Sequence, residues 1–419
     1  MKTRAVRLYG KKDLRLEEFD LPEIADDEIL VHIVSDSICM SSYKAAILGS
    51  DHKRVPNDID VHPIIIGHEM AGDIVQVGPK WQHQFKPGQK FSMQPALNYK
   101  GSMDSPGYSY RYCGGAATYA IMPQEVMELG CLLAYNGEAY YDASLAEPMS
   151  CIIGAFNASY HTSMGSYEHR MGIHPDGKLA ILAGAGPMGL GAIDLALHGD
   201  RKPSMVVVTD IDQARLDRAA EIFNSEVAAA AGVELHFVNT RQHADSSAYL
   251  RELSGGTGYD DVFVFAPVAQ AVEQGDEILG RDGCLNFFAG PTDTSFSAKC
   301  NFYNVHYNAT HIVGTTGGNT DDMLQSLRMT EQGKINPAVM VTHIGGLDSA
   351  AEATLNLPNI PGGKKLIYAD IDMPLVDIAD FEKLGKDDPR FAKLAEITNA
   401  NRGLWCVEAE KYLLEAWTV

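Results

Sequence analysis

The sequence contains no long hydrophobic run. No stretch of about 18 consecutive apolar residues occurs in its 419 residues, so we expect no membrane-spanning helix. The amino-terminal residues 1–9 lack the apolar core of a secretion signal and predict a first strand instead. Together these two absences predict a cytoplasmic protein.

Basic residues are scarce relative to acidic ones. The chain has 34 Lys and Arg residues against 55 Asp and Glu residues, which gives a formal net charge of −21. Such an acidic chain repels phosphate backbones and anionic lipids, so we expect neither nucleic acid nor membrane as a partner. A small anionic substrate would need a local cluster of Lys or Arg side chains to bind it.

The cysteines are too scattered to form a framework. Their number is odd and no two are arranged as Cys-x-x-Cys, which predicts reduced thiols. The same spacing excludes a four-cysteine structural zinc lobe in any one segment. The seven cysteines are Cys39, Cys113, Cys131, Cys151, Cys284, Cys300 and Cys406.

The segment Gly-Ala-Gly-Pro-Met-Gly at 184–189 is the most informative feature that the sequence does contain. An apolar run at 178–183 precedes it, and a helical pattern at 190–197 follows it. A second apolar run at 205–209 then ends at Asp210. Strand, glycine turn, helix, strand and acid in this order indicate a dinucleotide-binding βαβ unit.

Each position of this segment has an expected role in binding the cofactor. Gly184 permits a tight turn, Gly186 lets the pyrophosphate approach the backbone, and Gly189 lets the helix pack on the strand. Pro187 and Met188 complete the turn at a helix N-terminus, where free N–H groups favour a phosphate.

Asp210 bears on the choice between the two nicotinamide dinucleotides. Its carboxylate can accept hydrogen bonds from ribose hydroxyls and repels a 2′-phosphate, which predicts NAD(H) rather than NADP(H). Arg215 follows shortly after, and it either weakens that preference or is a solvated helix arginine. The sequence leaves these two interpretations of Arg215 open.

The pattern of elements divides the chain into parts. Residues 1 to about 150 alternate short apolar runs with turns, whereas strand and helix patterns alternate from about 178 onward. This predicts an α/β protein with a doubly wound parallel sheet and a mostly β domain. The expected domains are a catalytic domain at 1–157 and 318–370, a Rossmann domain at 158–317, and a helical extension at 371–419.

Two helical predictions concern particular segments. One helix is expected from residue 213 to about residue 231. In the extension, Asp388 and Pro389 predict the start of a helix that Gly403 ends, and a second helix is expected at 407–417. The amphipathic spacing of the extension indicates one buried face. We expect that the extension docks on its own subunit; the alternatives are a dimer contact or a cover over the active-site cleft.

Four side chains of ligand type lie in three short segments of the first 150 residues. They are Cys39, His68, Glu69 and Glu147. Individually, a buried cysteine, a lone histidine and a Glu-Pro helix start are ordinary structural features. One thiolate, one imidazole and one or two carboxylates together suit a tetrahedral zinc ion that keeps one position open for substrate.

With these residues the chain resembles the zinc-dependent medium-chain dehydrogenase/reductase family, on its sorbitol-dehydrogenase-like side. The resemblance covers residues 1 to about 370 and implies a GroES-like catalytic domain beside the Rossmann domain. The matching pieces are Cys39, Gly-His-Glu at 67–69, Val-Gln-Val-Gly at 75–78, Phe-Lys-Pro-Gly-Gln-Lys at 85–90, Gly-Gly-Ala-Ala-Thr-Tyr at 114–119, Ala-Glu-Pro at 146–148, the segment 184–189, Asp210, and Gly-Gly-Lys-Lys-Leu-Ile at 362–367.

The resemblance implies a zinc- and NAD(H)-dependent oxidoreductase. The spacing from Cys39 to His68, the segment 283–292 and the helical tail are most similar to L-sorbose 1-phosphate reductases, which interconvert a ketose phosphate and a hexitol phosphate. The alternatives are a dehydrogenase of a non-phosphorylated polyol, a zinc-free reductase of the same fold, or a catalytically silent nucleotide-binding protein. The family implies a homo-oligomer, a dimer or a tetramer. The sequence selects neither the sugar, its stereochemistry, nor the direction of reaction.

The family pattern also implies roles for single residues. Zinc would be held by Cys39, His68 and Glu147, with Glu69 or water exchanging into the ligand shell. Only Cys113 stands where relatives with a structural zinc have four cysteines, so we expect one catalytic zinc and no structural zinc.

Two further sets of residues are expected near the substrate. Ser41 would conduct a proton, although a local backbone bond is the alternative role of such a serine. Lys44 replaces the relay histidine of many relatives, and it would either end that relay or bind a substrate phosphate. Lys53 and Arg54 either bind the same phosphate or belong to a solvated loop.

Overall fold

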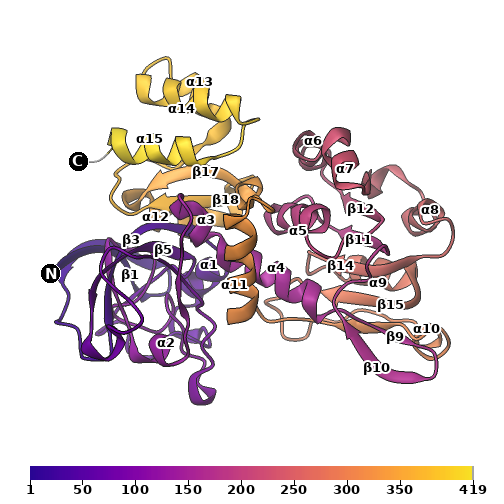
Figure 1. Cartoon of the computed structure of the whole chain (residues 1–419), viewed down its shortest axis with the longest axis horizontal. Coiled ribbons are helices and arrows are strands. Elements are labelled where there is room, and N and C mark those ends of the chain that lie inside the picture. Colours follow the sequence, from indigo (N-terminus) through magenta and orange to yellow (C-terminus); the bar gives the residue numbers. More distant parts are fainter. Residues whose placement is uncertain (418–419) are drawn as a thin grey trace. The chain divides into compact units, whose positions relative to one another are not determined.

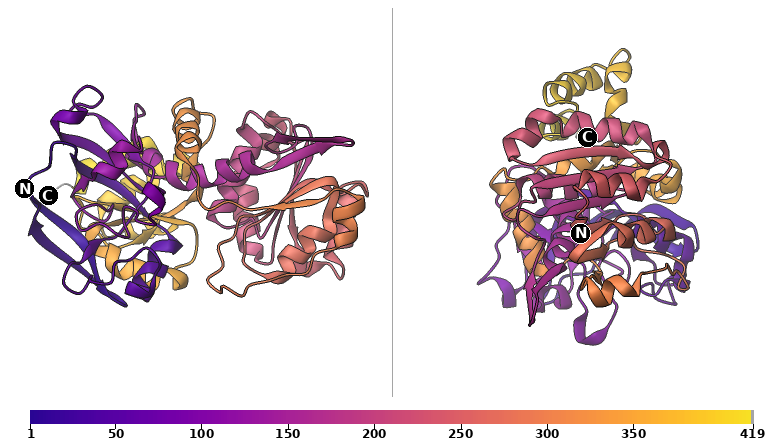
Figure 2. Two further views of the ribbon diagram at one scale, coloured as in Figure 1. Left: turned by 90° about the horizontal axis from the view of Figure 1, so that it is seen from below. Right: turned by 90° about the vertical axis from the view of Figure 1, so that its right-hand side faces the viewer.

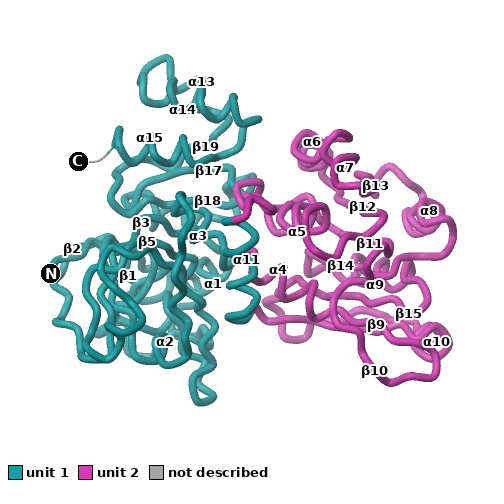
Figure 3. The backbone as a smooth tube through the Cα atoms, in the orientation of Figure 1, with its two compact units in different colours: residues 1–148, 319–331, 341–419 teal, residues 149–318, 332–340 magenta. Residues whose placement is uncertain are grey.

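A computed structural model describes residues 1–417, which form two compact units (Figure 3). Unit 1 comprises Met1–Pro148, Asn319–Glu331 and the chain from Val341 onward, and unit 2 comprises Met149–Gly318 and Gln332–Met340. No helix within the described range combines the length and the apolar composition that crossing a bilayer requires.

Unit 2 contains a six-stranded parallel sheet with the order β13-β12-β11-β14-β15-β16. Its central strands are buried apolar runs, as a sheet that is covered on both faces requires. The strand order reverses direction at β11, and ligands of such folds bind at this point. The doubly wound fold expected from the sequence is therefore confirmed. The strands are β11 (Lys178–Leu182), β12 (Met205–Asp210), β13 (Glu234–Asn239), β14 (Tyr259–Val264), β15 (Leu279–Phe287) and β16 (His311–Val313).

The helices of unit 2 differ from the sequence prediction in one place. The helix expected at 213–231 is broken into α6 (Gln213–Ile222) and α7 (Ser225–Ala231). Asn224 between them accepts hydrogen bonds from the backbone N–H groups of Glu226 and Val227, which starts a new helix. The other helices are α5 (Pro187–His198), α8 (Ser246–Leu253), α9 (Ala269–Ile278) and α10 (Phe302–Tyr307). Unit 2 also contains a hairpin of β9 (Tyr160–Ser163) and β10 (Ser166–Met171), which was not predicted from the sequence.

Unit 1 is built on an eight-stranded sheet with the order β19-β17-β18-β3-β5-β6-β8, in which β7 also pairs with β3, and on a three-stranded sheet with the order β2-β1-β4. The long strand β3 lies between β18 and β5, so the late part of the chain pairs directly with its beginning. The strands are β1 (Lys2–Gly10), β2 (Asp13–Asp20), β3 (Ile29–Ile38), β4 (Ile64–Ile65), β5 (Met70–Val77), β6 (Lys90–Met93), β7 (Tyr119–Met122), β8 (Leu132–Ala134), β17 (Val341–Gly346), β18 (Lys364–Tyr368) and β19 (Val376–Asp377).

The helices of unit 1 lie before, between and after these strands. The strand β17 begins at Val341, directly after a 3₁₀ turn at Pro337–Met340. The helices are α1 (Met40–Leu48), α2 (Gln124–Glu128), α3 (Tyr140–Ser144), α11 (Thr320–Glu331), α12 (Ala350–Asn356), α13 (Phe381–Leu384), α14 (Pro389–Ala400) and α15 (Val407–Trp417). The helix α4 (Ala146–Ala158) begins in unit 1, and its residues from Met149 onward belong to unit 2.

The first boundary between the units lies at Pro148 and Met149, earlier than the expected boundary after residue 157. A side chain at Gly191 of α5 would meet Ile152 at 2.7 Å, Met149 at 3.0 Å and Met340 at 3.1 Å. The body of α4 and the segment 332–340 therefore pack on α5 within unit 2. Glu147, in the first turn of α4, remains with unit 1.

The extension after residue 370 belongs to unit 1, and its helices α13, α14 and α15 lie together beside β17 (Figures 1 and 2). As expected, Asp388 caps α14 and Pro389 is its first residue. Trp405 is fully buried, and its indole N–H donates a hydrogen bond to the Tyr368 hydroxyl on β18 at 2.8 Å. The tail is thus docked on its own subunit.

Glu410 of α15 makes the most specific contact of the extension. Its carboxylate is 2% exposed and accepts the backbone N–H groups of Tyr140 and Tyr141 at 2.6 and 2.8 Å, and the Tyr368 hydroxyl at 2.8 Å. Burial raises the pKa of Glu410 to about 7. The tail therefore supplies the acceptor for the first turn of α3, the helix that precedes α4 and Glu147.

Replacing Glu410 tests how much this contact stabilises unit 1. Glu410→Ala leaves buried donors without an acceptor, so we expect the free energy of unfolding to fall by about 1–3 kcal/mol. Urea denaturation followed by tryptophan fluorescence measures this, because Trp405 and Trp417 both lie in the extension. The control is Lys411→Ala, which removes only an exposed ion pair with Glu138 and leaves the midpoint unchanged. Equal midpoints for both variants would contradict the capping role.

Candidate functional site

Cys39 lies at the junction between β3 and α1. It is the N-cap residue of α1 and makes no side-chain capping bond there, so its thiol is available to a ligand. The Ser41 hydroxyl, two residues later, donates to the Cys39 Sγ at 3.0 Å. Burial raises the pKa of the Cys39 thiol, against the opposing effect of the Lys364 charge.

His68 and Glu69 reach the same place from the turn between β4 and β5. Both are buried, at 4% and 0% exposure. Gly67 before them has φ +91°, and a Cβ there would lie 2.2 Å from a carboxylate oxygen of Asp36. Asp36 in turn accepts the backbone N–H of Glu69 at 3.1 Å. Only glycine permits this turn, because it combines a left-handed backbone with contact to a buried carboxylate.

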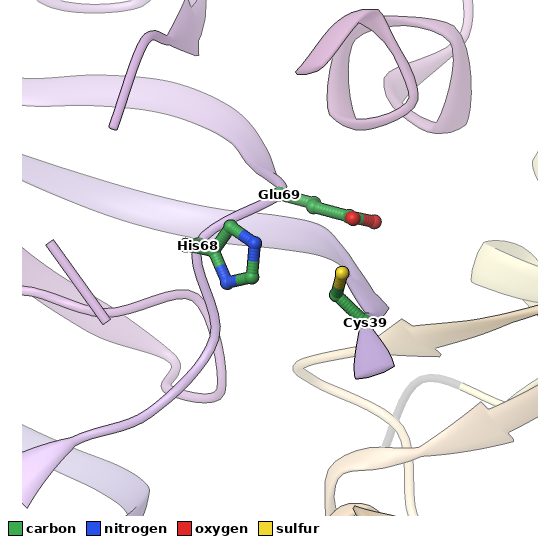
Figure 4. Close-up of side chains that lie close together, drawn as sticks. All are labelled: Cys39, His68 and Glu69. Atoms are coloured by element: carbon green, nitrogen blue, oxygen red, sulfur yellow. The ribbon is translucent and has the colours of Figure 1, made fainter. Parts of the chain in front are cut away.

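Cys39, His68 and Glu69 point toward one another, and their ligand atoms all lie within 4.8 Å of one another (Figure 4). The His68 ring is oriented by Ser42, whose hydroxyl lies 3.2 Å from Nδ1. Its Nε2 lies 3.4 Å from the hydroxyls of Ser41 and Tyr108. A thiol, an imidazole held by a second hydrogen bond and a carboxylate form a donor set that suits zinc.

The two candidate glutamates have different surroundings. Glu69 is engaged at both oxygens, one with the Lys364 ammonium and the other with the Ser37 hydroxyl. Glu147 is half-buried in the first turn of α4, and burial raises its pKa to about 7. Its charge interacts with those of His68, Glu69 and Cys39, so it shares their electrostatic environment. The geometry groups Glu69 with Cys39 and His68, whereas the family pattern selects Glu147.

Lys364 is a residue of this site to which the sequence analysis assigned no role. It stands within the matched segment 362–367, but nothing local shows that its strand passes Glu69. Burial lowers the pKa of Lys364, but the charges of Glu69 and Cys39 outweigh this effect and the net shift is upward. Lys364 is therefore a fixed positive charge that offsets the buried Glu69.

Two residues of the loop after α1, Arg54 and His52, contact the Tyr108 ring. The Arg54 guanidinium lies 5.4 Å from the centre of the Tyr108 ring, and the His52 ring stacks on the same ring at 5.7 Å. Burial lowers the pKa of His52, and the nearby charges of Arg54, Lys53 and Lys44 lower it further. The structure thus places Arg54 at the Tyr108 ring, and the charges of Lys53 and Lys44 act on His52 beside it.

Tyr108 was missed as a site residue at the sequence level. Tyr108 stands in the segment where the resemblance led us to look for cysteines, and it donates a hydrogen bond to the Ser41 hydroxyl at 2.8 Å. His52 directly precedes Lys53 and Arg54 in the sequence. A single tyrosine after Gly107 carries no local pattern that would predict the contacts of Tyr108.

The nucleotide segment of unit 2 joins β11 to α5. Gly186 caps α5 without a side-chain bond, and nothing lies within 4 Å of the position its Cβ would take, so the backbone there is open to an anion. Pro187 is the first residue of α5, and Met188 follows it. A Cβ at Gly189 would lie 2.0 Å from the Gly184 carbonyl oxygen, so this close approach requires glycine.

The tight turn itself differs from the expectation for Gly184. The left-handed backbone conformation lies at Ala183, with φ +53°, and not at Gly184. Gly184 is needed for space, since its Cβ would lie 2.5 Å from the Ile181 Cγ2. The constraint on this position is therefore packing against the strand.

Asp210 ends β12, next to this turn. Its carboxylate accepts backbone N–H groups from Ala185 at 3.2 Å, Ile211 at 2.8 Å and Asp212 at 3.1 Å. The acid is therefore held in place at the carboxyl end of the sheet. Arg215 lies exposed on α6, with its Nε 3.8 Å from the Asp212 carboxylate.

Comparisons with known proteins agree with both units. The model of the alcohol dehydrogenase GroES-like domain matches residues 25–129, and that of the zinc-binding dehydrogenase matches residues 187–332. The chain is 55% identical to a mannitol-1-phosphate 5-dehydrogenase of Aliivibrio fischeri, over 100% of this chain and 98% of the relative. It is 50% identical to an L-sorbose 1-phosphate reductase of Klebsiella pneumoniae, over 98% and 97% of the two chains.

Solved structures show the same fold. A 2R,3R-butanediol dehydrogenase from Bacillus subtilis matches with a TM-score of 0.71 at 20% identity, over 88% of this chain and 99% of that one. An alcohol dehydrogenase from Thermotoga maritima matches with a TM-score of 0.69, also at 20% identity, over 88% and 99%. With full-length relatives at half identity and ligand-type residues in place, this chain is an oxidoreductase that belongs to the zinc-dependent medium-chain dehydrogenase/reductase family.

Proposed function

We propose that the chain is a zinc- and NAD(H)-dependent oxidoreductase that interconverts a ketose phosphate and a hexitol phosphate, with L-sorbose 1-phosphate and glucitol 6-phosphate as the pair. The observation that carries this is the Arg54 guanidinium over the Tyr108 ring, whose hydroxyl donates a hydrogen bond to Ser41. The charges of Lys53 and Lys44 act on His52, which stacks on the same ring. In a chain with a net charge of −21, an arginine held beside a metal-type site suits a phosphate dianion. The names of both full-length relatives support a phosphorylated substrate.

A second phosphorylated substrate is favoured by the relative from Aliivibrio fischeri, whose name specifies mannitol 1-phosphate and carbon 5. In L-sorbose 1-phosphate the phosphate-bearing carbon is bonded to the carbonyl carbon. In mannitol 1-phosphate oxidised at carbon 5, several carbons separate them. Comparing kcat/KM for the two substrate pairs therefore distinguishes the candidates. Turnover of the free polyol alone would instead indicate a dehydrogenase of a non-phosphorylated substrate.

The chain's own residues would hold the metal and conduct the proton in this reaction. Cys39, His68 and one of Glu147 and Glu69 would hold zinc. When bound, zinc supplies a Lewis acid and the nicotinamide supplies or accepts a hydride. Ser41, within hydrogen-bonding distance of the Cys39 thiol and of Tyr108, would conduct the proton of the substrate hydroxyl.

The remaining residues would set charge and binding. Lys364 offsets the charge of Glu69, so the site does not gather uncompensated carboxylates. Lys44, Lys53 and Arg54 would bind the substrate phosphate. Gly186 and the first turn of α5 would bind the pyrophosphate of the cofactor, and Asp210 its ribose.

Metal analysis tests the zinc site. The purified protein should contain about one zinc per chain, as a single catalytic site requires. Cys39→Ser should lose it, whereas Cys113→Ala should retain it because we propose no structural zinc. Glu147→Gln and Glu69→Gln, compared by competition with a chelator, identify the carboxylate that binds directly. About two zinc ions per wild-type chain would contradict the proposal.

Cofactor preference tests Asp210. We expect a lower KM for NADH than for NADPH, because a carboxylate repels the 2′-phosphate. Asp210→Ser should reduce that preference. If Arg215 weakens the preference, Arg215→Ala should increase it, and no change would identify Arg215 as a solvated helix residue. A wild-type enzyme that prefers NADPH would show that Asp210 does not select the cofactor.

Substrate turnover tests the phosphate site. With zinc present, NADH oxidation should be much faster with L-sorbose 1-phosphate than with L-sorbose. Lys53→Ala and Arg54→Ala should each raise KM for the phosphate by about 10- to 100-fold, the effect of losing one charge-assisted hydrogen bond. Lys86→Ala, an exposed lysine of the same unit, is the matched control and should change nothing. Equal effects on both sugars would refute a phosphate role.

A further inference from the structure

We infer that Tyr108 is a positioning residue that couples phosphate recognition to the reacting end of the site: its ring orients Arg54 and His52, and its hydroxyl orients Ser41. This rests on the proposed function, because it takes Arg54, held over the ring, as part of the phosphate site. Nothing in the names of the relatives or in the matched families assigns a role to this residue.

The hydroxyl of Tyr108 is directed at the metal-type site. It donates to the Ser41 oxygen at 2.8 Å and lies 3.4 Å from the His68 Nε2. Ser41 in turn donates to the Cys39 sulfur. A serine hydroxyl rotates freely unless its lone pairs and proton are engaged, so the tyrosine selects one orientation for the group that would carry the proton.

The ring of Tyr108 is directed at the basic loop. The His52 ring is stacked on it with only 11° between the planes, and the Arg54 guanidinium lies within cation–π distance of the centroid. The loop is also fastened beside Tyr108, because the Ser109 hydroxyl donates to the Arg54 carbonyl at 2.7 Å. A flexible arginine head group is thus held in place before any phosphate binds.

The turn that carries Tyr108 also contacts the turn that carries His68. Gly107 has φ +77°, and a Cβ there would lie 2.1 Å from the Gly67 carbonyl oxygen and 3.0 Å from the His68 Cβ. Tyr108 is 4% exposed, so its position is determined by packing on every side. The hydroxyl therefore stays at Ser41 while the ring stays against His52 and Arg54.

Two substitutions separate the roles of hydroxyl and ring. Tyr108→Phe keeps the ring, so kcat should fall about tenfold for phosphorylated and free sugar alike, while KM stays unchanged. Tyr108→Leu also removes the ring, so KM for the phosphorylated sugar should rise about tenfold beyond that of the Phe variant, while KM for the free sugar stays the same. Tyr110→Phe, a half-buried tyrosine of the same segment, is the control that should alter neither parameter.

A double-mutant cycle tests the coupling directly. If the ring orients Arg54, then Arg54→Ala should raise KM for the phosphate about tenfold in the wild-type background and only slightly in the Tyr108→Leu background, so the two effects do not add. Zinc content and thermal midpoint, measured on each variant, exclude loss of metal or fold as the cause. Additive effects of the two substitutions would overturn the ring's role, and an unchanged kcat in Tyr108→Phe would overturn the hydroxyl's role.

Failure of the proposed function gives a different result from failure of this inference. If the wild-type protein prefers the free sugar, the phosphate proposal fails and the role of the ring fails with it. The role of the hydroxyl is then still decided by kcat of Tyr108→Phe on the free sugar. If the wild type prefers the phosphate but Tyr108→Leu raises KM for both sugars equally, only the present inference is overturned.

Discussion

The arrangement of the metal-type site depends on the buried ion pair between Lys364 and Glu69. The two side chains are only 6% and 1% exposed, and their residues lie 295 positions apart in the chain. Removing two charges from water costs several kcal/mol for each ion, so neither is tolerated here without the other. Because β18 pairs with β3, the strand that carries Lys364 runs beside the one that leads to Cys39. The late strand β18, which belongs to unit 1, therefore supplies a residue of the site.

The carboxyl-terminal extension continues the same structural dependence. Tyr368 at the other end of β18 contacts both Trp405 and Glu410, and Glu410 completes the first turn of α3. Through α3 the tail supports the start of α4, where Glu147 lies. The tail is thus a structural element of the catalytic unit, although amphipathic spacing alone said only that one of its faces is buried.

Local patterns explain why much of the fold was predictable. The β11–α5–β12 unit is continuous in sequence, and its strand, glycine and acid signals each follow from short-range geometry. The ligand-type residues Cys39 and His68 were found because their side-chain chemistry is rare in combination. Predictions failed where one side chain changes the local outcome: Asn224 starts a new helix within an apparently continuous pattern, and Ala183 takes the left-handed conformation expected of a glycine.

The sequence by itself determined the fold class, the nucleotide-binding unit and the set of metal-type side chains, because each depends on neighbouring residues or on residue chemistry. Only the tertiary structure decided which distant polar side chains contact one another. Three contacts join segments that are distant in sequence. Lys364 pairs with Glu69, Tyr108 contacts both Ser41 and Arg54, and Glu410 of α15 binds the first turn of α3. Such pairings arise from sheet register and from the packing of turns on one another, and neither leaves a periodic signal in the chain.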